Sequence, residues 1–137
     1  MKFKRRLTSG DLLLLELVFA IIFFCLTMSA SMAVFGNAYE MSSKAESLDS
    51  AIRESNSAIE IIRSGDSAEA IDAAFASAGY TGAALRSYAK EYDNGKYKID
   101  IEVSVSGKLY TAVINCYKQS EPETSIYDIS IKHALSK

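Results

Sequence analysis

The sequence predicts an α+β protein with a long N-terminal helix followed by a small antiparallel sheet of three or four strands. Apolar side chains recur at helical spacing as far as Ile62, first as a continuous run and then as a narrow stripe. After Gly95 the apolar period changes from about 3.6 residues to 2, which indicates strands. Four parts are expected: a basic leader (1–11), a transmembrane helix (12–35), the outer half of the same helix (36–64), and a short helix with the sheet (65–137).

The apolar run from Leu12 to Phe35 is long enough to cross a membrane, since a bilayer core needs about 20 helical residues. It is interrupted by Glu16, Thr27, Ser29 and Ser31. Thr8-x-x-Asp11 precedes the run and predicts a capping box at the start of the helix. Basic residues come before the run, and none follows until Lys44, which predicts a cytoplasmic N-terminus and an extracytoplasmic C-terminal domain.

A cleaved secretory signal is the competing interpretation of this segment. Ser29-Ala30-Ser31 and Ser31-Met32-Ala33 both have the small-x-small form that signal peptidases recognise. That reading predicts a soluble product beginning near Ala33. The length of the apolar run and the acid inside it favour a retained membrane helix.

The helical pattern continues beyond the membrane segment as a heptad stripe. Its positions advance by alternating steps of four and three residues, with one polar lapse at Ser55: Ala45, Leu48, Ile52, Ser55, Ile59 and Ile62. We therefore expect one helix from about Ser9 to Ser64, with Gly36 and Asn37 as its weak point, where a bend would form. The stripe either covers the chain's own sheet or meets a helix of another copy; the first interpretation is favoured.

A second, shorter helix and then the sheet are expected after Ser64. Asp66 and Glu69 are assigned as its N-terminal cap pair, and Gly79 closes it. Residues 80–84 are interpreted as a loop. Strands are predicted over 97–105, 108–117 and 127–132, with a strand break at 119–123, which contains Pro122. A hairpin turn is predicted at Asp93-Asn94-Gly95, and residues 85–92 before it either pair as a further strand or continue as helix. Such a sheet needs a cover, and the outer half of the long helix can supply it.

Composition and motifs argue against several classes of function. The domain after Phe35 holds more acidic than basic side chains, so no nucleic-acid partner is predicted. No nucleophile motif, glycine-rich phosphate loop or metal-ligand spacing is present, which predicts a non-enzymatic protein without cofactor or metal. Cys25 lies in the membrane run and Cys116 in a predicted strand, so a disulfide between them is not expected.

Together these features resemble the type IV pilin group, including the pseudopilins of type II secretion and competence systems. The matching parts are the leader residues Lys2 to Arg6, then Gly10, the apolar helix with its early Glu16, and the sheet after Asn94. The resemblance implies a minor pilin or pseudopilin of a surface filament. The implied partners are other pilin subunits, the membrane, a prepilin peptidase that cuts after Gly10, and an assembly platform.

In this family the early glutamate neutralises the N-terminal amine of a neighbouring subunit, a role the resemblance implies for Glu16. One departure concerns the cut site. Asp11 follows Gly10, where family members usually carry a hydrophobic residue, and Glu16 is the sixth residue after the cut instead of the fifth. Either the site carries one extra residue or the chain is never processed, and Asp11 would compete with Glu16 for the new amine.

Two alternatives remain open from the residues themselves. Glu16 lies about one helical turn from Leu12, so its carboxylate can also reach water at the inner membrane interface by snorkelling. Correspondingly, the chain can be a single-pass signal-anchored protein whose extracytoplasmic domain binds a ligand or an envelope component as a monomer.

Overall fold

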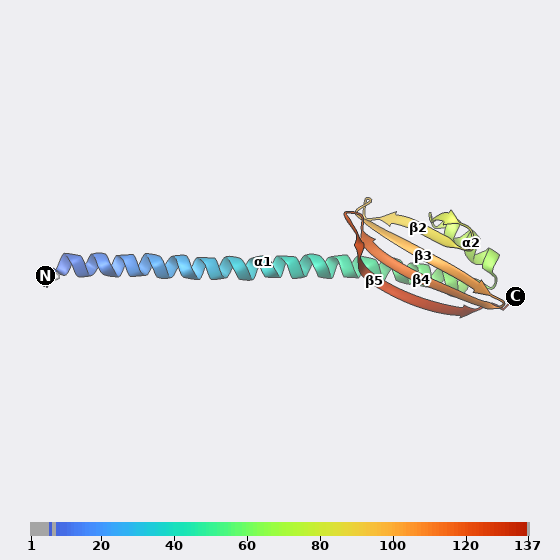
Figure 1. The fold of residues 1–137 in the computed structure, drawn as a ribbon, viewed down its shortest axis with the longest axis horizontal. Helices are drawn as coiled ribbons and strands as arrows, with labels where there is room; N and C mark the ends of the chain where they lie inside the picture. The colour runs from blue at the N-terminus through green and yellow to red at the C-terminus, as the bar shows by residue number, and fades with distance from the viewer. Residues whose placement is uncertain (1–5, 7, 137) are drawn as a thin grey trace. The chain divides into compact units, whose positions relative to one another are not determined.

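The computed structural model describes residue 6 and residues 8–136, and these form two helices and five strands (Figure 1). Most of the basic leader, including Lys2, Lys4 and Arg5, lies outside the described residues. By its internal contacts the chain divides into two compact units, Met1–Ser43 and Lys44–Lys137. The helix α1 contributes to both units.

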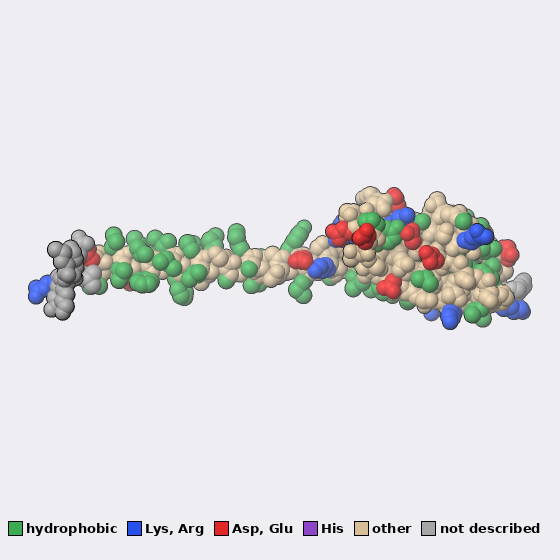
Figure 2. Space-filling view, in the orientation of Figure 1, with side chains coloured by type: hydrophobic (Ala, Val, Ile, Leu, Met, Phe, Trp, Pro, Cys, Tyr) green, Lys and Arg blue, Asp and Glu red, His purple; other side chains and the backbone are tan. Residues whose placement is uncertain are grey.

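Helix α1 comprises Ser9–Ser64, 56 residues, and it passes through Gly36 without interruption. In the first unit it is long and apolar enough to cross a membrane, by length and composition. Its side chains over residues 12–35, called the stem from here on, are exposed, and Figure 2 shows hydrophobic side chains along it. An α+β protein with a long apolar N-terminal helix is therefore confirmed.

The second unit has its core where α1, α2 and the sheet meet. The core joins small side chains of α1 to apolar and aromatic side chains from the short helix and the strands. Its fully buried members include Ala51, Ala58, Ile62, Ile71, Phe75, Ile99, Ile101, Tyr110, Ala112, Ile114 and Cys116. One face of the sheet is thus covered by helices, as a half-apolar sheet requires.

The face that α1 turns toward this core differs from the predicted stripe. Its buried positions are small residues together with one isoleucine: Ser47, Ala51, Ser55, Ala58 and Ile62. Leu48 and Ile52 keep 41% and 36% of their surface exposed, so the assignment of these two residues as the cover was wrong. The physical reason is spacing, because small side chains let the helix backbone lie close to the sheet. The Cys116 thiol on β4, for example, lies 3.8 Å from the Ala51 carbonyl oxygen.

The sheet has five antiparallel strands in the order β1-β2-β3-β4-β5, so the predicted number of three or four was too small. Each strand pairs with its neighbour in sequence: β1 (Thr81–Ala83), β2 (Ser87–Tyr92), β3 (Tyr97–Ser106), β4 (Leu109–Lys118) and β5 (Glu121–Ala134). The additional strand, β1, lies in the stretch interpreted as a loop. Gly82 permits its close pairing with β2, since a Cβ there would meet the Ser87 carbonyl oxygen at 2.2 Å.

Turn chemistry explains where the strands end. Asp93, Asn94 and Gly95 all have positive φ, and the Asp93 carbonyl accepts a hydrogen bond from the Lys96 amide, which confirms the hairpin turn between β2 and β3. Pro122 lies inside β5 rather than between strands. It is tolerated there because β5 is an edge strand and Pro122 lies between Glu121 and Ser125, where the register against β4 shifts as in a β-bulge.

Helix α2 (Ala68–Ser77) packs Ile71 and Phe75 into the core. Its N-cap is Ser67, whose hydroxyl accepts a hydrogen bond from the Ala70 amide at 3.3 Å. The sequence-based assignment of Asp66 as the cap was therefore displaced by one residue. Serine is an equally good cap, and only the backbone geometry distinguishes neighbouring candidates.

Candidate functional site

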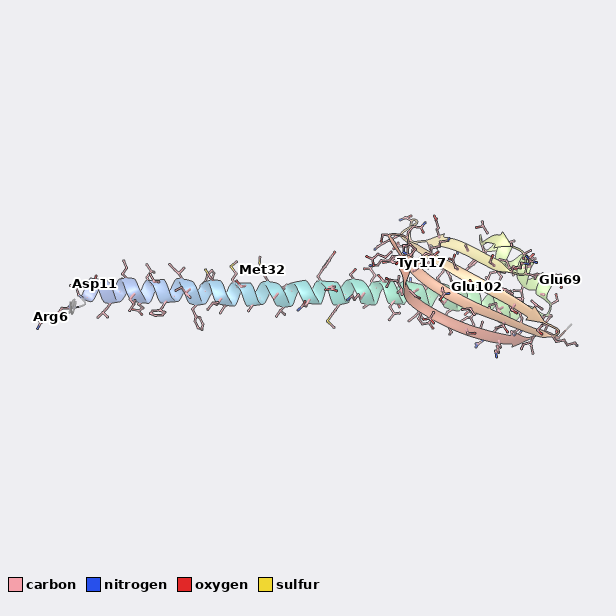
Figure 3. The ribbon with its side chains drawn as sticks, in the orientation of Figure 1. Arg6, Asp11, Met32, Glu69, Glu102 and Tyr117 are labelled. Carbon is pink, nitrogen blue, oxygen red and sulfur yellow. The ribbon has the colours of Figure 1, made fainter. Side chains whose placement is uncertain are left out.

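The predicted processing residues, Gly10 and Asp11, lie in the first turn of α1. Figure 3 shows Asp11 at this end of the helix. The helix begins at Ser9, so the peptide bond between Gly10 and Asp11 is inside the helix. The Leu12 amide donates to the Thr8 carbonyl oxygen at 3.2 Å and closes a turn around this bond. The candidate cut site is consequently held in helical backbone in the uncut chain.

Thr8 and Asp11 form the capping box that their spacing predicts. The Asp11 carboxylate Oδ2 accepts hydrogen bonds from the Thr8 amide at 3.1 Å and from the Thr8 hydroxyl at 2.9 Å. In return, the Thr8 hydroxyl oxygen accepts a hydrogen bond from the Asp11 amide at 3.4 Å. Aspartate replaces the usual glutamate at the third helical position and reaches back to the cap in the same way.

The same hydrogen bonds favour the ionised form of Asp11. They lower the pKa of its carboxyl, mainly through the Thr8 amide and secondly through the Thr8 hydroxyl. A negative charge at the start of a helix is also favourable, because the first turn carries the positive end of the macrodipole. Asp11 therefore acts in the uncut chain as a helix-terminal anion.

Glu16 lies one turn beyond Leu12 on an apolar face of the stem. It borders a shallow hollow on the helix surface, lined by Glu16, Phe19, Ala20, Phe23, Phe24 and Thr27. Glu16, Ala20, Phe23 and Thr27 are spaced by four, three and four residues and share one face. Ala20 and Thr27 are small, and larger phenylalanine side chains line the hollow beside them.

The stem's hydroxyl groups are satisfied within the helix, as an apolar surrounding requires. Thr27 donates to the Phe24 carbonyl oxygen at 2.9 Å, Ser29 to that of Cys25 at 2.8 Å, and Ser31 to that of Thr27 at 2.9 Å. Glu16 is different. Among the residues that the structure describes, none forms a hydrogen bond or an ion pair with its exposed carboxylate.

The structure does not bring Glu16 and Asp11 together on one side of the helix. Five helical residues correspond to about 1.4 turns and a rise of about 7.5 Å, which places the two carboxylates on different faces. Glu16 is therefore poorly placed to neutralise an amine at position 11 of its own chain. An amine brought by another molecule meets no such restriction.

Comparison of the chain with protein-family models, with curated proteins and with solved structures finds no match.

Other polar groups in the second unit serve the packing of the domain. Burial raises the pKa of the Cys116 thiol, which lies 3.3 Å from the Ser55 hydroxyl and stays protonated. The His133 Nε2 lies 3.1 Å from the Gly65 carbonyl oxygen, where it ties β5 to the end of α1. Over residues 6 and 8–136, no group of three or more histidine, cysteine, aspartate or glutamate side chains is placed to hold a metal ion.

Two features of these sites were not found from the sequence. The first is the hollow beside Glu16, although the four-three-four spacing from Glu16 to Thr27 was available as a signal. The second is a polar cluster in which Glu54 on α1 accepts hydrogen bonds from Tyr80 and from Lys90 on β2. Tyr80 and Lys90 lie 26 and 36 residues after Glu54 in the sequence, and no local sequence pattern links the three residues.

Proposed function

We propose that this protein is a non-enzymatic subunit of a type IV pilin-like filament, a minor pilin or pseudopilin that assembles through its N-terminal stem. Its partners would be other pilin or pseudopilin subunits within a type IV pilus, a competence pilus or a type II secretion-like filament. The N-terminus would lie in the cytoplasm, the stem in the cell membrane, and the sheet domain outside. An assembly platform would extract the subunit from the bilayer.

The observation that carries this proposal is the Glu16 carboxylate. It is exposed on an apolar helix face and has no partner among the described residues. A charge in the hydrocarbon region is costly unless it reaches water or meets an opposite charge. In the proposed filament a neighbouring subunit's amine would supply such a charge, and the shallow hollow beside Glu16 is where the neighbour's helix would pack.

Removal of the leader completes the proposed arrangement. Hydrolysis of the bond after Gly10 adds water, leaves a carboxylate on Gly10 and creates a new amine on Asp11. It also removes the four cationic side chains of Lys2, Lys4, Arg5 and Arg6 from the end of the stem. Each of these would oppose movement of the helix out of the bilayer by a few kcal/mol.

Substitution of Glu16 tests this proposal. We expect Glu16→Leu to abolish co-assembly of the full chain with itself and with companion subunits, measured by cross-linking in isolated membranes. Glu46→Leu, an exposed acid on the outer part of α1, is the matched control and should leave cross-linking unchanged. If Glu16→Leu cross-links as well as the unaltered chain, the filament proposal is wrong.

A second function, a single-pass signal-anchored protein with an extracytoplasmic binding domain, is favoured by the capping box alone. An intact box at Thr8 and Asp11 makes the uncut chain a well-terminated helix, as a permanent anchor requires. This alternative predicts full-length protein in the membrane and no effect of Glu16→Leu on its oligomeric state. The intact mass of the membrane-extracted protein, produced together with its own processing peptidase, distinguishes the two functions.

A further inference from the structure

The amide that a peptidase would release at the candidate cut site is itself hydrogen-bonded. The nitrogen of the bond between Gly10 and Asp11 is the Asp11 amide, and it donates to the Thr8 hydroxyl oxygen at 3.4 Å. The Thr8 hydroxyl in turn donates to Asp11 Oδ2 at 2.9 Å. Together with the hydrogen bond from the Leu12 amide to the Thr8 carbonyl oxygen, these contacts connect Thr8, before the bond, to Asp11 and Leu12, after it.

Helical backbone is a poor peptidase substrate. Proteolysis concentrates in segments whose backbone is free of secondary structure, and a structured bond is cut only after local opening. When opening and closing are fast compared with cleavage, the rate follows the population of the open form. Any contact that stabilises the first turn of α1 therefore slows cleavage between Gly10 and Asp11.

We propose that the Thr8–Asp11 pair is a latch that holds the bond between Gly10 and Asp11 in its helical form, so that opening of this pair limits removal of the leader. That the pair holds the bond in helical form is a claim about the conformation of the chain alone. That its opening limits leader removal rests on the proposed function. Thr8 acts here as a positioning residue, because it holds the bond without taking part in the chemistry.

The latch is tested first with a reagent that does not depend on any pilin machinery. An endopeptidase that cuts on the amino side of aspartate recognises the bond before Asp11, and the full chain in lipid nanodiscs is the substrate. Thr8→Val removes the hydroxyl that donates to the carboxylate and accepts from the amide. The loss of a helix cap of ordinary strength should raise the cleavage rate about 2- to 30-fold.

Three controls make this result specific. Thr8→Ser restores the hydroxyl and should be cut at the rate of the unaltered chain. Ser9→Ala removes a neighbouring hydroxyl that lies outside the box and should have no effect. Cleavage before Asp93, in the exposed hairpin turn, serves as an internal reference for enzyme activity and should be equal in all variants.

Mass spectrometry of the products decides between the outcomes. Faster release of residues 1–10 in Thr8→Val, with Thr8→Ser unchanged, supports the latch. Equal release in Thr8→Val and the unaltered chain overturns it.

A second arm separates the latch from the proposed function. The same variants are produced in cells together with a prepilin peptidase, and the intact mass of the membrane-extracted chain is measured. Faster processing of Thr8→Val supports both halves of the inference. Equal processing of all variants overturns the claim that the latch limits leader removal. If no variant is processed in cells while the endopeptidase still distinguishes them, the latch stands and processing as a pilin is overturned.

Discussion

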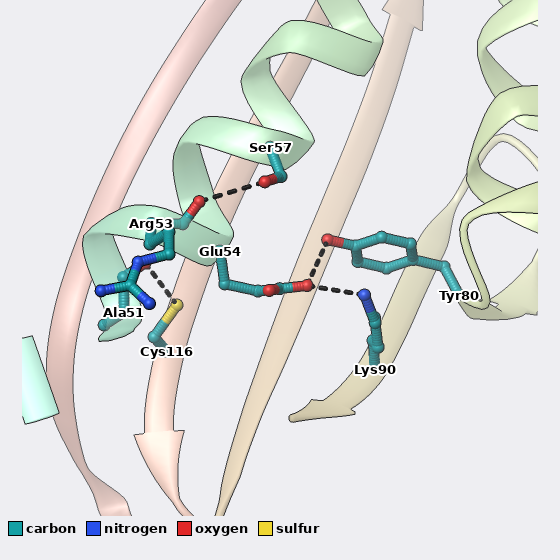
Figure 4. Close-up of polar contacts among 7 residues, drawn as sticks. All are labelled: Ala51, Arg53, Glu54, Ser57, Tyr80, Lys90 and Cys116. Carbon is teal, nitrogen blue, oxygen red and sulfur yellow. Dashed lines mark hydrogen bonds and ion pairs between the residues drawn. The ribbon is translucent and has the colours of Figure 1, made fainter. Parts of the chain in front are cut away.

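Glu54 on α1 and Lys90 on β2 form an ion pair in which Nζ lies 2.8 Å from Oε1 (Figure 4). The Tyr80 hydroxyl donates to the same oxygen at 3.5 Å, so one carboxylate holds the helix to two other segments of the domain. The pair is partly shielded from water, with 31% and 19% of the Lys90 and Glu54 side chains exposed. Such pairs are harder to break than exposed ones, because each group loses its partner without regaining full hydration.

We expect Glu54→Gln to lower the free energy of unfolding of the domain by roughly 1–2 kcal/mol. Glutamine keeps the volume and one acceptor but leaves the Lys90 ammonium without its counter-charge. Denaturant unfolding of the full chain in detergent measures the change. Tyrosine fluorescence is the natural probe, since the chain has eight tyrosines and no tryptophan.

Asp49→Asn provides the control for this prediction. Asp49 pairs with Arg53 at 2.6 Å, but their side chains are 71% and 76% exposed. Its substitution should change the free energy of unfolding by less than about 0.5 kcal/mol, as is usual for exposed pairs. Equal effects of the two substitutions would show that the Glu54 pair contributes no more than a surface contact.

Ala51→Leu should destabilise the domain through overpacking. Ala51 is fully buried, and its carbonyl oxygen lies 3.8 Å from the Cys116 thiol, so no room remains for a larger side chain between α1 and β4. We expect a loss of about 1–3 kcal/mol in the free energy of unfolding. Leu48→Ala should cost less than about 1 kcal/mol, because Leu48 is 41% exposed. The reverse order of the two effects would mean that α1 uses the predicted face after all.

The bounds of α1 were predictable because its apolar period is sustained over the whole length and Thr8 and Asp11 mark its start. The buried face was not predictable from the same period. Two stripes run along the outer part of the helix, one of larger residues at Leu48 and Ile52 and one of small residues at Ala51 and Ser55. Hydrophobicity favours the first, whereas close packing on the sheet uses the second.

The strands β2 to β4 follow from alternation and from the turn at Asp93 to Gly95, while β1 is three residues long and too short to show a period. The acid at Glu16 and the box at Thr8 were visible in the sequence as local patterns. In the filament that we propose, Glu16 meets a second molecule, and no pattern within one chain encodes the placement of that molecule. The Glu54 cluster depends on the register of β2 against α1, which is a tertiary feature.

Tyr88 should make the domain sensitive to alkaline pH. Burial, and secondly its hydrogen bond to Asp72 Oδ1 at 2.6 Å, raise the pKa of the Tyr88 hydroxyl to about 12 from the ordinary value of 10.0. The folded state thus holds this proton while the unfolded chain releases it. The stability that the protonated Tyr88 hydroxyl contributes to the folded state is fully present below pH 10 and is lost as the pH rises toward about 12.

In the Tyr88→Phe variant we therefore expect the free energy of unfolding to fall less steeply with pH between pH 10 and 12. The decrease in slope should approach one proton, or about 1.4 kcal/mol per pH unit. Thermal unfolding of the full chain followed by circular dichroism at several pH values gives the slope. Burial also raises the pKa of Tyr80, so a residual slope should persist in the variant. An unchanged slope would contradict the raised pKa of Tyr88.

Gly65 and Gly36 should respond in opposite directions to the same substitution. A Cβ at Gly65 would lie 2.1 Å from the Ile71 Cγ1, and Ile71 is fully buried in the core, so Gly65→Ala forces the start of α2 away from the end of α1. We expect a loss of about 1–3 kcal/mol in the free energy of unfolding. Gly36 lies inside α1, and a Cβ added there would meet no atom within 4 Å beyond its chain neighbours and the adjacent helix backbone, so Gly36→Ala should stabilise the helix by about 1 kcal/mol. Helix content on heating, measured by circular dichroism of each full-length variant in detergent, reports both effects. Destabilisation by Gly36→Ala would show that this position needs the freedom of glycine, and a neutral Gly65→Ala would show that Ile71 has room to move.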